Sequence, residues 1–218
     1  MKEKVFIAFM LVLLVGISGC KTRSDAETAG YFPGENPHGF WAALDETLLR
    51  LDEPSLYQQR SKTDLEPYRM VCIQSWDKPF FIRAWKDSRG MRVRVIRLNC
   101  EGAFYGYSDY DETFKVSGEQ WDKLTKTVRT SGFWEMPTAE KIMGLDGEDW
   151  LLEAEANGRY HQVHRWSPSV HTEQRHLKEF QEVCSYFFTL SKLKLREPTM
   201  VDRQREENQQ YSLPKRKF

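Results

Sequence analysis

The stretch WLLEAEANGRYHQVHRW, from Trp150 to Trp166, constrains the fold more than any other part of the chain. At its centre lies Asn157-Gly158, a pair that tolerates the positive φ angles of a type I′ turn, with alternating residues on both sides. The stretch is therefore predicted to form a β-hairpin, and the turn fixes its register. The expected pairs are Ala156–Arg159, Glu155–Tyr160, Ala154–His161, Glu153–Gln162, Leu152–Val163, Leu151–His164 and Trp150–Arg165.

Alternation sorts the hairpin residues onto two faces. The first has apolar residues at its centre and is expected to face the core; it carries Trp150, Leu152, Ala154, Ala156, Arg159, His161, Val163 and Arg165. The second is polar and is expected to face solvent; it carries Leu151, Glu153, Glu155, Tyr160, Gln162 and His164. On the core face, Arg165 is placed to make a cation–π contact with Trp150.

The two histidines of the hairpin lie three residues apart, so they point to opposite sides of the strand. They cannot bind one metal ion together, and a zinc site needs three or four converging ligands. His161 is expected to donate a hydrogen bond at the edge of the core. His164 could form an acid–base pair with its diagonal neighbour Glu153, although the same residues are also typical of a solvated surface.

A candidate surface site combines this polar face with the preceding loop, GLDGED (144–149). Calcium would need more oxygens in a tighter pattern than this loop offers, so a turn with solvated acids is expected. The candidate residues are Glu153, Tyr160, His164, Asp146 and Asp149. No catalytic residue, cofactor or metal ligand is assigned, since the sequence contains no Gly-rich phosphate loop, GxSxG or HExxH motif.

Short segments rich in β-branched and aromatic residues predict further strands over residues 68–76, 80–85 and 91–99. The links between them are too short for crossovers, so the strands are expected to be antiparallel. Arg97 breaks the alternation of the preceding arginines, which predicts a bulge near Val95-Ile96. The glycine- and tyrosine-rich residues 102–111 are expected to form a loop or a ragged edge.

Helices are expected before and after these strands. Ser117 and Gln120 match a capping box that opens a helix over 118–131. Another helix is expected over 171–192, and an earlier one from Asn36-Pro37 to Pro54. The fold class is therefore α+β, with an antiparallel sheet and a C-terminal β-hairpin packed against two or three helices.

Three cysteines follow residue 20. Cys72 and Cys100 lie on neighbouring predicted strands and could form a disulfide in an exported compartment, which would stabilise the fold by about 3–4 kcal/mol. That pairing is left open. Cys184 lies on the apolar face of the last predicted helix and is expected to be a buried thiol.

The first twenty residues resemble a bacterial lipoprotein signal peptide. A charged MKEK precedes an apolar run of thirteen residues, short for a bilayer span, and then Ile17-Ser18-Gly19-Cys20. The last four residues are similar to a lipobox, which implies removal of the leader and palmitate-type acylation of Cys20. Lys21 after the cysteine implies sorting to the outer membrane. A transmembrane anchor with a chance cysteine is the alternative.

The chain of 218 residues thus divides into a signal peptide (1–19), a tether (20–35), a single α+β domain (36–193) and a charged tail (194–218) that is expected to be disordered. Its formal net charge of zero argues against nucleic acid as a partner, because phosphate binding needs a basic excess.

Four motifs resemble a family of uncharacterised bacterial secreted proteins and lipoproteins. They are WDKPFFIR (76–83), FWEMP (133–137), GLDGEDWLLE (144–153) and GRYHQVHRWSP (158–168), in this order. The family has no assigned activity, so the resemblance implies no catalytic or binding residue. Its recurring residues could equally be structural; they are Trp134, Asp146, Gly147, Trp150, Tyr160, His161, Arg165, Trp166 and Pro168.

These features favour an envelope lipoprotein on the periplasmic face of the outer membrane that acts as a non-enzymatic binding or assembly module. Its partners would be the membrane, through lipidated Cys20, and a protein of the envelope. A periplasmic inhibitor or immunity lipoprotein that neutralises a toxin is one alternative, and a structural spacer is another. A hydrolase of envelope polymers, using Glu153, His164 or the Asp146–Asp149 loop, is also open.

Overall fold

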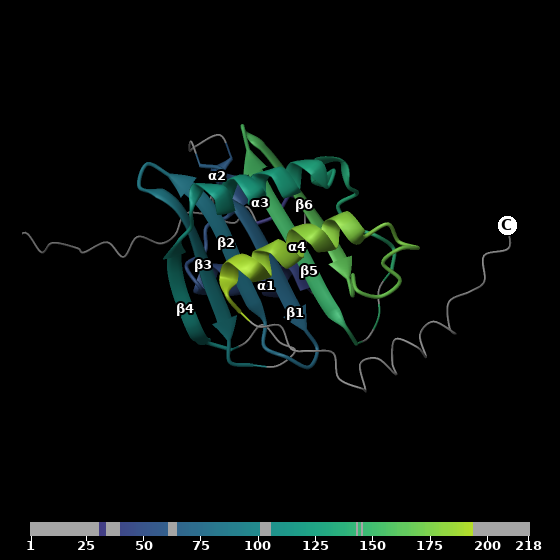
Figure 1. Ribbon diagram of the computed structural model, residues 1–218. Helices are drawn as coiled ribbons and strands as arrows, with labels where there is room; N and C mark the ends of the chain where they lie inside the picture. The colour runs from purple at the N-terminus through teal and green to yellow at the C-terminus, as the bar shows by residue number, and fades with distance from the viewer. Residues whose placement is uncertain are drawn as a thin grey trace, which may run out of the picture.

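The computed structural model describes residues 31–33, 40–60, 65–100, 106–142, 144 and 146–193. Within them, six strands form one antiparallel sheet in the order β4-β3-β2-β1-β5-β6 (Figure 1). The strands are β1 (Tyr68–Gln74), β2 (Phe80–Asp87), β3 (Gly90–Leu98), β4 (Ser108–Lys115), β5 (Glu148–Ala156) and β6 (Arg159–Trp166). The α+β fold class with a C-terminal hairpin is confirmed.

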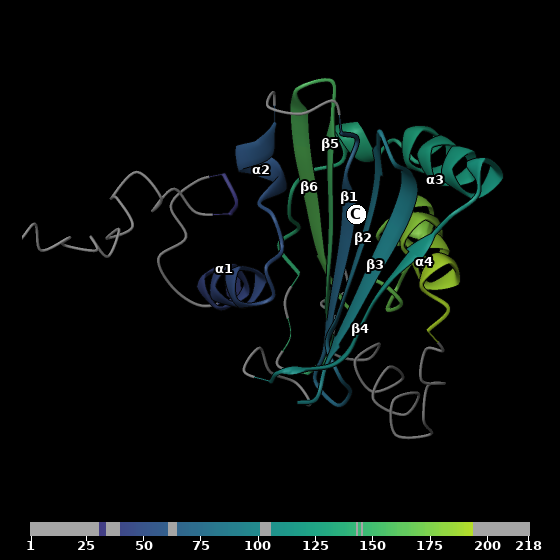
Figure 2. The same cartoon turned by 90° about the vertical axis from the view of Figure 1, so that its left-hand side faces the viewer.

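Helices cover both faces of the sheet (Figure 2). Helices α1 (Phe40–Arg50) and α2 (Leu56–Gln59) lie on one face, and α3 (Gly118–Thr130) and α4 (Lys178–Ser191) lie on the other. A short 3₁₀ helix, η2 (Phe133–Glu135), follows α3. In these residues, no helix is both long and apolar enough to cross a membrane.

Two apolar clusters hold these layers together. The α3/α4 side includes Met70, Ile82, Val95, Leu152 and Phe187, all fully buried. The α1 side is smaller and includes Leu44, Leu48, Val71, Phe81 and Leu151. Because β1, β2, β3 and β5 contribute alternate side chains to the two clusters, the sheet lies in the middle of the domain.

The hairpin forms as predicted. Asn157 and Gly158 have φ angles of 54° and 77°, as a type I′ turn requires. All the predicted cross-strand pairs of β5 and β6 are present, from Ala156–Arg159 to Trp150–Arg165. The cation–π prediction is wrong in its partner: the Arg165 guanidinium lies 5.8 Å from the ring of Phe180, whereas the Trp150 ring packs on Phe188.

The prediction that the second hairpin face is solvated is wrong. Leu151, Glu153 and Glu155 are almost completely buried, because α1, α2 and the segment between them cover this face. The polar residues on it suggested water, but Glu153 meets Arg69, which belongs to a network with Glu53, Arg83 and Arg94. The sequence pattern alone could not show those partners, which come from residues 53–94.

Residues 102–111 were expected to form a loop or a ragged edge. Residues 102–105 lie outside the described residues, and from Ser108 the chain forms β4, a strand at the edge of the sheet. Most side chains of β4 are polar and exposed, because the strand lies at the edge of the sheet. The sequence therefore lacks the apolar alternation by which a strand is recognised. The predicted bulge near Val95-Ile96 is also misplaced. The register shifts between Arg97, which pairs with Tyr110, and Leu98, which pairs with Ser108. Asp109 is the extra residue of the bulge.

The helix over 118–131 is confirmed, with the Ser117–Gln120 capping box and a left-handed Gly132 after its end. The helix over 171–192 begins later than expected, at Lys178. The preceding turn is held by Arg175, which donates to the carbonyls of Trp166, Ser167 and Val170. The expected cap at Asn36-Pro37 lies outside the described residues, and α2, capped by Ser55, was not expected.

Cys72, Cys100 and Cys184 form no disulfide with one another. Cys72 belongs to the α3/α4 cluster and Cys100 packs against the α1 cluster, so the two thiols lie on opposite faces of the sheet. The open Cys72–Cys100 pairing is therefore not formed. Cys184 is a buried thiol, as expected.

Candidate functional site

A group of buried and partly buried charges lies between the sheet and α1, and we call it the arginine layer: Glu53, Arg69, Arg83, Arg94 and Glu153. Two of the candidate residues, Glu153 and Tyr160, lie in or against it. Its residues come from β3, β2, β1 and β5, and Arg94 also binds Asp111 of β4 through two hydrogen bonds, so the network extends across five neighbouring strands. The layer thus connects the hairpin to the opposite margin of the sheet.

Arg69 of β1 lies at the centre of the arginine layer and its side chain is fully buried. Its Nε donates to Glu153 Oε2 at 2.7 Å, and its Nη1 donates to the Pro54 carbonyl at 2.8 Å and lies 3.5 Å from Glu53 Oε2. Burial disfavours the charged form, but the two carboxylates outweigh it and raise the pKa of Arg69. Arg69 is therefore a permanent cation inside the protein.

Glu53 lies in the segment between α1 and α2 and is the second acceptor of the layer. Its carboxylate accepts from Arg83 Nε at 2.8 Å and from Arg94 Nη1 at 2.9 Å, in addition to Arg69. A single buried carboxylate thereby binds cations from three adjacent strands. These ion pairs hold the chain after α1 against the sheet. Without Glu53, the three arginines would face one another as like charges.

Tyr160 of β6 completes the layer near the hairpin turn. Its hydroxyl lies 2.8 Å from both Glu153 Oε1 and Gln162 Oε1. Burial, and then the nearby Glu153 carboxylate, hold the pKa of Tyr160 well above its usual range. The hydroxyl therefore stays protonated and serves as a hydrogen-bond donor, not as a base.

Asp45 projects from α1 toward this layer. Desolvation is the main cause that raises the pKa of Asp45 to about 6, and the nearby Glu153 carboxylate adds to it. Its Oδ1 is buried and makes no hydrogen bond within the described residues. Burial thus moves the pKa of the Asp45 carboxyl well above its ordinary value of 3.8.

His164 and Asp149 form a separate pair on the same face. His164 Nε2 lies 2.9 Å from Asp149 Oδ1, and both side chains are partly exposed. The rings of Phe40 and Trp41, from the first turn of α1, lie 5.1 and 5.6 Å from the imidazole. The possible Glu153–His164 pair is not formed, because Glu153 is bound by Arg69 and His164 lies against its other diagonal neighbour, Asp149.

The remaining candidate, Asp146, is exposed. Its loop packs closely on the end of β6. A Cβ added at Gly144 would lie 2.1 Å from the ring of Trp166, and one at Gly147, where φ is 149°, would lie 2.2 Å from Ser167 Oγ. Among the described residues, no group of three metal-binding side chains is found.

The FWEMP segment runs along β6 and is bound by its side chains. His161 Nε2 lies 2.9 Å from the Met136 carbonyl, as expected for a hydrogen bond at the core edge, and burial lowers the pKa of His161. Arg165 donates to the Pro137 carbonyl at 2.9 Å and Arg159 to that of Trp134 at 2.6 Å. These motif residues therefore have structural roles.

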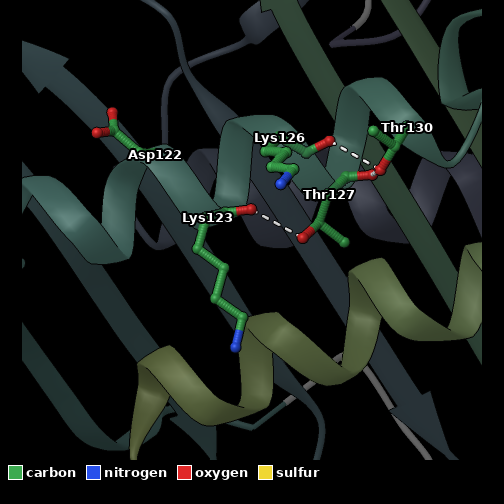
Figure 3. A pocket seen from close by; sticks show the side chains of 5 residues that line it. All are labelled: Asp122, Lys123, Lys126, Thr127 and Thr130. Carbon is green, nitrogen blue, oxygen red and sulfur yellow. Dashed lines mark hydrogen bonds between the residues drawn. The ribbon is translucent and has the colours of Figure 1, made fainter.

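A hollow of about 470 Å³ lies on the outer surface of α3 (Figure 3). Its lining includes Lys123, Lys126, Thr127 and Thr130, and Lys123 extends toward α4. Both threonine hydroxyls donate to carbonyls of their own helix, at 2.8 and 3.0 Å. The Lys123 ammonium lies 4.9 Å from the centre of the Tyr186 ring, and the lining also includes Asp122.

The fold and this site define an α+β protein with a charged layer buried beneath its first helix. Comparison of the chain with protein-family models yields no match. Comparison with curated proteins likewise finds no similar sequence. Sequence reasoning missed Glu53, Arg69, Arg83 and Arg94 as part of the site. The available signal was an arginine inside an otherwise apolar strand, as in YRMVCI (68–73).

Proposed function

We propose that this chain is an envelope lipoprotein, anchored through lipidated Cys20 on the periplasmic face of the outer membrane, whose body is a non-enzymatic binding or assembly module. The observation that carries the proposal is the lipobox-like sequence Ile17-Ser18-Gly19-Cys20 after a short apolar run. Acylation with more than one chain would make such an anchor stable.

The position of the first packed residues adds a spatial limit. Tyr31 donates from its hydroxyl to the Glu53 carbonyl at 2.9 Å, and Phe32 is buried. The ten residues 21–30 separate Cys20 from this contact. Even fully extended, they span about 35 Å. A lipidated Cys20 would therefore keep the body close to the bilayer surface.

The roles of the candidate residues favour binding over catalysis. Glu153 is buried and paired with Arg69, the Tyr160 hydroxyl is bonded to Glu153, and the His164 imidazole lies against two rings of α1. General acid–base catalysis needs a group within hydrogen-bond reach of a substrate. The groups that looked most reactive therefore hold α1 on the sheet, and the exposed surface is left for recognition.

Metabolic labelling with palmitate tests the anchor. We expect label on the wild-type chain, in outer-membrane fractions, and none on Cys20→Ser. Cys100→Ser is the matched control and should keep the label. An unlabelled wild-type chain that retains its leader by mass spectrometry would overturn the proposal.

Affinity capture from detergent-solubilised membranes tests the binding module. A stoichiometric envelope protein that is retained by the wild type supports it, whereas repeated recovery of the bare chain counts against it. If the captured protein is a toxin whose lethality the chain relieves, the module is an inhibitor.

One observation favours the hydrolase alternative: the His164–Asp149 pair at 2.9 Å, with both side chains partly exposed. Incubation of the purified chain with isolated peptidoglycan tests this alternative. Release of soluble fragments that is lost in His164→Gln but kept in His176→Gln would establish hydrolysis and overturn the non-enzymatic proposal. Equal, background release from all three chains supports it.

A further inference from the structure

The two margins of the sheet differ. At β6, the segment after η2 covers the edge: the His164 N–H donates to the Thr138 carbonyl at 2.7 Å, and Arg165 donates to the carbonyl of Pro137. At β4, the described residues provide one partner strand only, β3. Figure 2 views the molecule from this β4 side. An edge strand of this kind can pair with another strand.

The backbone groups of β4 that point away from β3 can be identified. The Val116 N–H donates to the Met91 carbonyl at 3.1 Å, which makes this a hydrogen-bonded pair. In an antiparallel ladder such pairs alternate, so Phe114 and Glu112 also face β3. The N–H and C=O groups of Asp111, Thr113 and Lys115 therefore point outward, and their side chains are exposed.

This pattern limits how β4 can pair with a second β4. The outward N–H and C=O groups of one copy must pair with those of the other. In a symmetric antiparallel pair, one residue of β4 must therefore lie opposite the same residue of the second copy. Centring on Asp111 or Glu112 places like charges directly opposite each other, which is unfavourable. A pair centred on Phe114 would align fewer residues of the two strands and would place no acidic residue opposite a basic one.

Centring on Thr113 has neither defect. It places Asp111 opposite Lys115 of the other copy, twice, and Tyr110 opposite Val116, an aromatic and β-branched pair on the other face. Glu112 then lies opposite Phe114. Asp111 keeps its bonds to Arg94 but remains partly exposed, so a lysine can still approach it.

We propose that β4 pairs with β4 of a second copy of this chain, antiparallel and centred on Thr113, so that two sheets join into one. The arrangement is a two-fold symmetric, isologous contact. A single pair of strands buries less surface than a stable soluble dimer needs, so association in solution is expected to be weak. The inference does not depend on lipidation, although a shared membrane would raise the local concentration of copies.

The test uses the purified full chain in detergent, followed by sedimentation equilibrium. We expect a concentration-dependent dimer for the wild type. Thr113→Pro should weaken association at least about tenfold, because it deletes an outward N–H without touching the ladder to β3. Thr113→Val keeps that N–H and should dimerise as the wild type does. Circular dichroism shows whether both variants are folded.

Charge and cross-linking test the register. Lys115→Glu should weaken the dimer about tenfold, since it turns two opposite-charge pairs into like-charge pairs. Lys126→Glu, on α3, should leave it unchanged. Under mild oxidation, Thr113→Cys should form a disulfide to itself, identified by mass spectrometry, and Glu112→Cys should not. A wild type that stays monomeric, a proline variant that dimerises as well, or a Glu112→Cys cross-link would each overturn the proposal.

Discussion

Arg69 and Glu153 form a 2.7 Å ion pair in which neither side chain has any exposed surface. The two residues are direct Cα partners on β1 and β5, so the pair crosses the junction between the hairpin and the rest of the sheet. A buried charge is costly unless it is paired and hydrogen-bonded. The pair therefore makes the position of the hairpin depend on the arginine layer beneath α1.

Removing the central cation should be strongly destabilising. In Arg69→Met, Glu53 and Glu153 lose a buried partner, and the free energy of unfolding should fall by about 3–5 kcal/mol. Urea denaturation followed by tryptophan fluorescence measures it. Arg89→Met is the control, because the Arg89 side chain is 76% exposed and its pair with Asp87 should contribute less than about 1 kcal/mol. Equal effects of the two variants would contradict the role of the layer.

Asp45 should make stability depend on pH. Burial raises the pKa of Asp45 to about 6, above its ordinary value of 3.8. The folded state then holds the proton more tightly than the unfolded chain, so this contribution is present below pH 3.8 and is lost as pH rises through about 6. Asp45 faces Glu153, Arg69 and Tyr160.

The measurement is the unfolding free energy of the wild type minus that of Asp45→Asn, between pH 4 and pH 7. We expect the difference to fall by about 1 kcal/mol with rising pH, because Asp45 is partly exposed and solvent screens its charge. Asp122→Asn, on the exposed side of α3, should give a flat difference. A flat line for Asp45→Asn as well would show that the carboxyl titrates normally.

Gly144→Ala should destabilise the loop before β5. The new Cβ would lie 2.1 Å from the Trp166 ring, and moving that ring should cost about 1–3 kcal/mol. Thermal unfolding compares it with Gly118→Ala, where a Cβ meets nothing within 4 Å and stability should be unchanged or higher. Unchanged stability of Gly144→Ala would mean that the loop does not pack on Trp166.

Thiol reactivity should separate the cysteines. Cys72 and Cys184 are fully buried, and burial holds the pKa of each thiol well above its usual range. In the Cys20→Ser chain, iodoacetamide should modify Cys100 at least about tenfold faster than either of them, as followed by peptide mass spectrometry, since the thiolate reacts. The difference should vanish in urea. Rapid native modification of Cys72 would contradict the burial.

Local rules were sufficient where the decisive contacts are close in sequence. Asn157-Gly158 fixed the hairpin register because positive φ angles select a turn, and each pair then follows from the turn. The Ser117–Gln120 capping box likewise located the start of α3. The alternation of β3 was misread, however. Arg97 and Leu98 continue the period of two, but both faces carry apolar residues, so no side stands out as the core.

By itself, the sequence determined the hairpin, its register, the capped helix and the α+β class, because turn chemistry and periodicity act over a few residues. The tertiary structure alone decided that the polar hairpin face is buried. Arg69 binds Glu153 from a distant part of the chain, and Glu53 and Arg83 join the same network. Whether a glutamate lies in water or inside the protein depends on which partners the fold brings to it. The period-two alternation of a strand does not show which partners these are.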